Sequence, residues 1–210
     1  MSLLSAVGVE HLRLLDAVRS DGAEAAYRDR LLVESLDEWM NTPSWSESVE
    51  FLRTHPGLLD DDGIAAAQEL AEDRPADTSV VLHAALLPLV RRLGSEAAFG
   101  CLGNRQALHR LVQQAVQLAD PELLAHASTI ELIAFEDAFP SFVHRLAAGI
   151  LVGRPDDSPL ALLAGVADHC TTENRDRCTA EIAALIGRAP EHAIGLSTLL
   201  QAVLATVPAS

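Results

Sequence analysis

The chain has 210 residues, 49% of them hydrophobic, and its 30 acidic and 15 basic residues give a formal net charge of −15. All 15 basic residues are arginines, which excludes Schiff-base lysines, pyridoxal-phosphate anchors and the P-loop lysine. The acidic balance speaks against binding to nucleic acid or to an anionic membrane surface, because both need clustered positive charge.

Helical spacing runs through the whole chain, whereas strand signals are nearly missing. Only 4% of residues are aromatic, and no sustained alternation of apolar and polar residues occurs. Apolar residues recur three and four positions apart, as on one face of a helix. These stripes lie at 12–18, 31–40, 49–52 and 108–118. We therefore expect an all-α fold of roughly eleven helices.

Capping residues predict where several helices begin and end. Ser44 with Glu47 reads as a capping box, and the pairs Asp120-Pro121 and Ser158-Pro159 each place an N-cap before a helix-opening proline. Pro190 is predicted to open the last helix in the same way. The expected glycine helix ends are Gly22, Gly94, Gly103 and Gly187. Open loops are expected at 60–63 and 154–158.

An internal repeat relates two early segments. Residues 11–27 and 83–99 align at an offset of 72 without a gap, with nine of 17 positions identical. A looser echo relates 55–59 to 120–124. Repeats of this kind stack and share a core. We expect residues 1–210 to form one domain of antiparallel helix pairs, stacked as a short right-handed solenoid. Its repeat units would be 11–82 and 83–140, with 141–210 as diverged or capping helices. The boundary between the repeats and these last helices would lie near Pro140 or in the loop 153–158.

The repeated mark Arg-x-x-Gly-x-Glu-Ala-Ala-aromatic, at 19–27 and 91–99, resembles helical, tetratricopeptide-like repeat regions of large actinobacterial proteins. The segment from Trp45 to Leu59 resembles them too, and the resemblance covers roughly residues 10–125. Such regions often precede caspase-like CHAT protease domains. The resemblance implies a helical-repeat array that serves interaction or sensing and has no catalytic residues of its own. Any catalytic or effector domain that it serves would belong to another protein. The strict 34-residue tetratricopeptide consensus is not met.

These observations predict a non-enzymatic protein-interaction module: a scaffold, adaptor or sensor subunit without a cofactor. The partner would be another protein or a peptide, and a homodimer is an alternative. On so acidic a chain, a local basic patch suits an acidic ligand, and Trp45 would anchor apolar contacts. The arginines of this patch are Arg91, Arg92, Arg105 and Arg110. The competing interpretation is a solvated face whose arginines pair with Glu96.

The second functional hypothesis is an all-helical metal-dependent enzyme or small-molecule-binding protein, with His169, Cys170 and Cys178 as metal ligands. The cysteine spacing matches no common zinc motif, and buried cysteines are the alternative. An odd number of cysteines without an N-terminal signal peptide predicts a reducing cytoplasm.

The remaining titratable residues are expected to be structural or solvated. His11 and His83 occupy equivalent repeat positions, which favours a role such as bonding a carbonyl of a neighbouring helix. Glu131, Glu136 and Asp137 are expected to lie in water, with residues 130 and 133–135 forming the core face.

Overall fold

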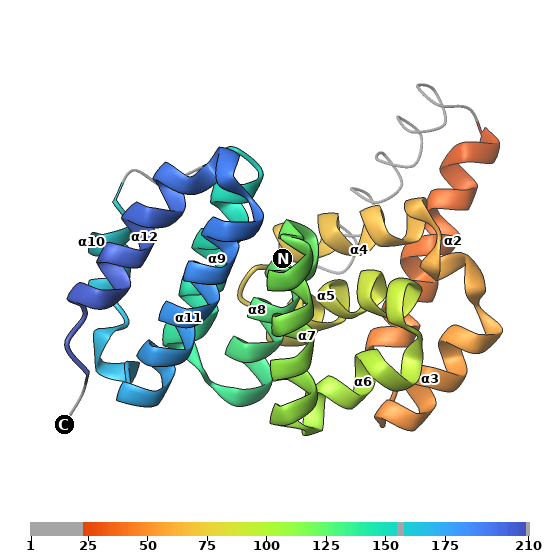
Figure 1. Cartoon of the computed structure of the whole chain (residues 1–210). Helices are drawn as coiled ribbons and strands as arrows, with labels where there is room; N and C mark the ends of the chain where they lie inside the picture. Colours follow the sequence, from red (N-terminus) through yellow and green to blue (C-terminus); the bar gives the residue numbers. More distant parts are fainter. Residues whose placement is uncertain (1–22, 155–157, 209–210) are drawn as a thin grey trace, which may run out of the picture. The chain divides into compact units, whose positions relative to one another are not determined.

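The computed structural model describes residues 23–154 and 158–208 (Figure 1). Over these residues the fold is all-α, with eleven α-helices and no strand, which confirms the predicted class and the approximate number of helices. The chain divides into two compact units, residues 1–74 and 75–210. We describe each unit by itself, and stacking as a solenoid stays a prediction.

The N-terminal unit contains α2 (Ala23–Met40), α3 (Trp45–Thr54), the 3-10 turn η1 (Pro56–Leu59) and α4 (Asp61–Asp73). Trp39 is fully buried, and its indole N–H donates to the Ser48 carbonyl at 3.2 Å, which ties α2 to α3. Gly63 in the first turn of α4 lies so close to the Leu58 carbonyl group of η1 that a side-chain methyl would overlap it. Glycine is therefore required for this packing.

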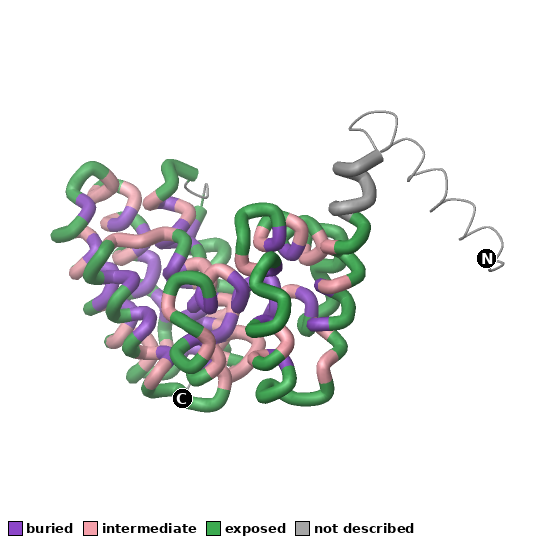
Figure 2. The backbone as a smooth tube through the Cα atoms, turned by 90° about the vertical axis from the view of Figure 1, so that its right-hand side faces the viewer, coloured by how far each residue is buried: buried purple, intermediate pink, exposed green. Residues whose placement is uncertain are grey.

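The C-terminal unit contains eight α-helices and two 3-10 turns. They are α5 (Thr78–Leu93), α6 (Ser95–Gly103), α7 (Arg105–Leu118), α8 (Pro121–Phe135), α9 (Ala138–Leu151), α10 (Pro159–Ala164), η2 (Ala167–His169), α11 (Thr172–Arg188), η3 (Pro190–His192) and α12 (Ala193–Ala205). Helix α8 packs against α5, α7 and α9, while α11 packs against α7, α9 and α12. Buried stretches alternate with exposed ones along the described chain (Figure 2), and α5 and α9 are the helices with most buried residues. None of the described helices is long and apolar enough to cross a membrane.

The predicted N-caps are confirmed by their hydrogen bonds. Ser44 Oγ accepts from the Glu47 N–H at 3.3 Å, Asp120 Oδ1 from the Leu123 N–H at 2.9 Å, and Ser158 Oγ from the Ala161 N–H at 3.4 Å. Pro190 opens η3, which leads directly into α12. Local capping chemistry is therefore readable from the sequence.

The glycine helix ends were predicted less well. Gly94 has φ +84° and ends α5, as expected. Gly103 is the last residue of α6 and Gly187 the last but one of α11, so helices end there as expected, but neither glycine has the predicted positive φ. Among the described residues, a positive φ also occurs after helices at Gly153, with φ 72°, and at the non-glycine residues Ala119 and Glu136, with φ 48° and 56°. Gly22 lies outside the described residues.

One of the predicted loops needs correction. Asp60 directly precedes α4 and residues 61–63 form its first turn, so the loop expected at 60–63 is wrong. Its acidic residues suit the positive end of the helix dipole. Pro140 lies in the first turn of α9, and the break between α8 and α9 falls just before it, at residues 136–137. The repeat units stay a prediction. Residues 155–157 of the other expected loop, and residues 11–22 of the first repeat segment, lie outside the described residues.

Candidate functional site

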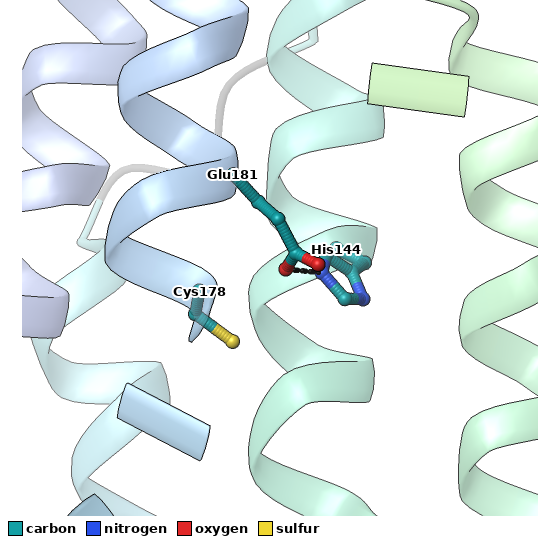
Figure 3. A group of neighbouring side chains, drawn as sticks. All are labelled: His144, Cys178 and Glu181. Atoms are coloured by element: carbon teal, nitrogen blue, oxygen red, sulfur yellow. Dashed lines mark hydrogen bonds and ion pairs between the residues drawn. The ribbon is translucent and has the colours of Figure 1, made fainter. Parts of the chain in front are cut away.

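Three charged or ionisable side chains meet in the interior of the C-terminal unit. His144 on α9 is fully buried between two carboxylates. Its Nδ1 lies 2.6 Å from Oε2 of Glu131 on α8, and its Nε2 lies 2.9 Å from Oε2 of Glu181 on α11. Glu131 is 1% exposed and Glu181 is 9% exposed. One imidazole thus links α8, α9 and α11, and Figure 3 shows its contact with Glu181 of α11.

The two short contacts indicate the protonation state of the imidazole. A neutral ring has one N–H and one lone pair, so it would present a lone pair to one of the two carboxylates. The imidazolium instead donates both N–H groups. Burial alone would lower the pKa of His144, but the two carboxylates outweigh it and raise that pKa to about 10. His144 is therefore a cation at neutral pH in this structure.

A second cation completes the group beside Glu131. Nη2 of Arg177 lies 3.8 Å from Glu131 Oε1, and the Arg177 Nη1–H donates to Nε2 of His109 on α7. Burial, together with the nearby guanidinium, lowers the pKa of His109, which keeps that ring neutral. Two carboxylates, one imidazolium and one guanidinium leave the cluster with no net charge. This balance is what permits ionised groups in the interior.

Cys178 lies against this cluster. It is on α11, three residues before Glu181, so that both side chains project from the same side of the helix. Figure 3 shows its sulfur directed toward the space in front of Glu181 and His144. One ligand atom each from His144, Cys178 and Glu181 lie within 4.8 Å of one another. Burial raises the pKa of the Cys178 thiol well above its usual value.

A surface groove of about 330 Å³ lies between α7 and α11. Glu181 is one of its lining residues, whereas His144, Cys178 and Glu131 are not. The remaining lining side chains are mostly amides or small. They are Gln113, Gln114, Val116, Gln117, Ala180 and Ala184.

The arginines predicted to form a basic patch are exposed, and two of them pair with acids of the same unit. Arg92 on α5 contacts Asp120, the N-cap of α8, at 2.5 Å. Arg105 pairs with Asp137, and its guanidinium lies 5.0 Å from the centre of the Phe135 ring. Arg91 is in the last turn of α5 and Arg110 is on α7. Asp120 and Asp137 are thus the acidic partners of Arg92 and Arg105.

Trp45 is the first residue of α3 in the N-terminal unit and is 43% exposed.

The three residues suggested as metal ligands, His169, Cys170 and Cys178, are not brought together as a group in the structure. His169 is exposed in η2, and Cys170 is a buried residue directly after that turn. Among the described residues, the group of potential ligands brought together contains Cys178 but neither His169 nor Cys170. His83 also differs from expectation, because its Nδ1 lies 2.7 Å from the Ser79 carbonyl of its own helix.

The sequence analysis missed the central residues of the cluster. Glu131 was expected in water and is buried, while Glu136 is exposed and Asp137 pairs with Arg105. The signal that could have revealed them is the position of each acid on its helix, on the same face as the apolar residues. Glu131 lies four residues after the buried Ala127, and Glu181 three residues after Cys178, so each acid shares a face with core residues. When charged residues occupy core-facing positions on several helices, a cluster of buried polar side chains is expected.

Comparison with models of known protein families, with curated proteins and with solved structures finds no match to this chain.

Proposed function

We propose that the chain is a non-enzymatic protein-interaction module, a scaffold, adaptor or sensor subunit, which binds another protein through α10 and α12. The observation that carries this proposal is an exposed, uncharged apolar surface on these two helices. Ile194 is 87% exposed, Leu204 is 55% exposed and Leu160 is 54% exposed. Val207, just after α12, is 79% exposed. Exposed apolar side chains that gather on adjacent elements are typical of protein-binding surfaces.

The two helices form a continuous element of the C-terminal unit. They pack against each other and lie side by side in Figure 1, where α12 is drawn in dark blue. Neither α10 nor α12 contains an Asp, Glu, Arg or Lys residue, although the whole chain carries a net charge of −15. Charged residues are depleted in the same way from the centres of protein interfaces.

The charge of the chain indicates which kind of partner this surface suits. Two copies, each with a net charge of −15, repel each other, and this opposes self-association at physiological salt. A different protein that presents an apolar helix in neutral or basic surroundings avoids this repulsion. We therefore assign the α10–α12 surface to such a partner rather than to a second copy.

The arginine patch is the weaker surface for the same function. Arg92 and Arg105 are already paired with Asp120 and Asp137, so an acidic ligand would have to displace an internal carboxylate from each. The exposed apolar side chains on α10 and α12 can bind a partner without breaking an ion pair within the chain.

The experiment combines affinity capture with reconstitution. The tagged full chain is used to isolate bound proteins from the source cells, and each candidate is then purified and titrated against the chain. Burying Ile194 contributes about 1.5–3 kcal/mol, so Ile194→Asp with Leu204→Asp should weaken binding by more than about 100-fold. The control is Leu118→Asp, which introduces one negative charge, against two in the double variant, at an exposed leucine of α7.

Equal affinity of the double variant and the wild type would refute the assigned surface, as would equal loss with Leu118→Asp. The mass of the purified chain in solution tests the choice of partner. A monomer supports it, whereas a dimer that dissociates on Ile194→Asp substitution would assign the surface to a second copy.

A further inference from the structure

We propose that His144, Cys178 and Glu181 form a binding site for a divalent transition-metal ion, and that zinc fits this set of ligands best. The proposal is independent of the partner surface on α10 and α12, since it rests on the interior between α9 and α11. Imidazole nitrogen, thiolate sulfur and carboxylate oxygen are the three donor types that bind zinc in proteins.

The ligand atoms are already gathered by the packing of two helices. They lie within 4.8 Å of one another without an ion between them. Zinc bonds of about 2.0–2.3 Å at tetrahedral angles place ligand atoms roughly 3.5 Å apart. His144 Nε2 and Glu181 Oε2, now at 2.9 Å, would therefore separate by roughly half an ångström. A change of this size requires side-chain adjustment only.

Glu131 orients the imidazole as metal sites require. A histidine ligand usually donates its second ring N–H to a carboxylate, which fixes the tautomer and turns the other nitrogen to the metal. Here His144 Nδ1 lies 2.6 Å from the carboxylate of Glu131, a residue that is 1% exposed, and Nε2 is the nitrogen that contacts Glu181. Glu131 is thus a positioning residue, and Arg177 stays beside it as a compensating charge.

The thiol of Cys178 differs from the two other thiols. The Cys101 thiol donates to the Ala97 carbonyl at 3.3 Å, and the Cys170 thiol lies 3.8 Å from the Thr171 carbonyl. Within the described part of the chain, Cys178 makes no such hydrogen bond although it is fully buried. A buried thiol with no partner, next to an imidazole and a carboxylate, is suited to a metal ion.

The charges balance with and without the ion. Without it, the cations His144 and Arg177 offset Glu131 and Glu181. Zinc binding would release two protons, one from His144 Nε2 and one from Cys178 Sγ. The ion and Arg177 then carry three positive charges against two carboxylates and one thiolate. The interior stays neutral, which avoids the cost of an unpaired buried charge.

The groove along α7 and α11 borders one ligand residue. Glu181 lines it, so one of the three ligand residues lies at the surface side of the buried site. Three protein ligands leave a fourth position for water, which is the arrangement of zinc sites that remain open to a small ligand.

The test uses the full chain after removal of metals with a chelator. Zinc is titrated by calorimetry, and Co²⁺ serves as a coloured probe because a cobalt–thiolate bond gives a charge-transfer absorption in the near ultraviolet. We expect one ion per chain and a thiolate band in the cobalt spectrum. Absence of binding at micromolar protein, or binding without a thiolate band, would overturn the proposal.

Two cysteine variants separate this site from the residues first suggested by the sequence. Cys178→Ser should abolish the thiolate band and weaken zinc binding, whereas the matched Cys170→Ser should retain both. Glu131→Gln should retain the band and weaken binding by about 10–100-fold. A band that survives in Cys178→Ser, or is lost in Cys170→Ser, would contradict the assignment. Far-UV circular dichroism verifies folding, and the wild-type cobalt spectrum decides the question even where a variant does not fold.

Discussion

Replacing Glu131 by glutamine removes one buried charge and leaves the shape of the side chain nearly unchanged. In the metal-free protein, His144 and Arg177 would then face only one carboxylate, that of Glu181. The interior would carry an uncompensated positive charge, or His144 would lose its proton and with it one charged hydrogen bond. Either outcome destabilises the C-terminal unit, because a buried ion pair that loses one partner leaves the other desolvated.

The magnitude follows from the position of His144. Its pKa is about 10 in the folded chain against 6.5 in an ordinary environment. A raised pKa stabilises the fold fully below pH 6.5, and this stabilisation is lost as the pH rises toward 10. At pH 7 it corresponds to about 4 kcal/mol. Of the two carboxylates, Glu131 raises the pKa of His144 more than Glu181 does. We therefore expect Glu131→Gln to lower the free energy of unfolding by about 3 kcal/mol.

The assay is urea unfolding followed by far-UV circular dichroism between pH 6.5 and 10, with a chelator present. The difference between the variant and the wild type should shrink as the pH rises. The matched control is Glu136→Gln, which removes the same charge at an exposed position and should change stability by less than about 0.5 kcal/mol. Unchanged stability of Glu131→Gln, a difference independent of pH, or equal loss in the control would refute an ionised cluster.

Three further predictions concern other parts of the chain. Gly63→Ala should destabilise the N-terminal unit by about 1–3 kcal/mol because the methyl overlaps η1. Gly57→Ala in the same unit, with open space around the added methyl, should not. The fluorescence of Trp39 and Trp45 follows unfolding of this unit. Asp120→Ala should cost about 0.5–2 kcal/mol at pH 7 by loss of the α8 N-cap. Burial raises the pKa of Asp120, but Arg92 and the backbone N–H of α8 lower it overall, so this difference should fade below about pH 4 in unfolding curves. All three thiols are buried with raised pKa values, so a thiol reagent at pH 8 should label the folded chain far more slowly than the chain in urea.

The features of the fold that could be predicted are those determined by a few neighbouring residues. Ser44, Asp120 and Ser158 cap helices because a short side chain there reaches an N–H two or three residues later. Helix ends at Ala119 and Glu136 could not be predicted in this way. Their left-handed conformation runs against the preference of an L-residue, so residue type gives no signal for it.

The candidate site was missed because its residues meet only after folding. Cys178 was considered as a metal ligand from its nearness in sequence to His169 and Cys170, whereas its neighbours in space are His144 and Glu181. A single sequence shows that Glu131 shares a helical face with apolar residues, but it does not show which residue of another helix will offset its charge. That pairing depends on how α8, α9 and α11 pack.

The buried cluster has a consequence for the order of folding events. Glu131 and His144 are 13 residues apart, His144 and Glu181 are 37 apart, and His109 and Arg177 are 68 apart. Contacts between distant residues close large loops, and two carboxylates give up their water only when the last helix docks. We therefore expect the cluster to form late, after the transition state. Its loss in Glu131→Gln should accelerate unfolding and leave the refolding rate nearly unchanged, so the cluster sets how long the native state of this unit persists.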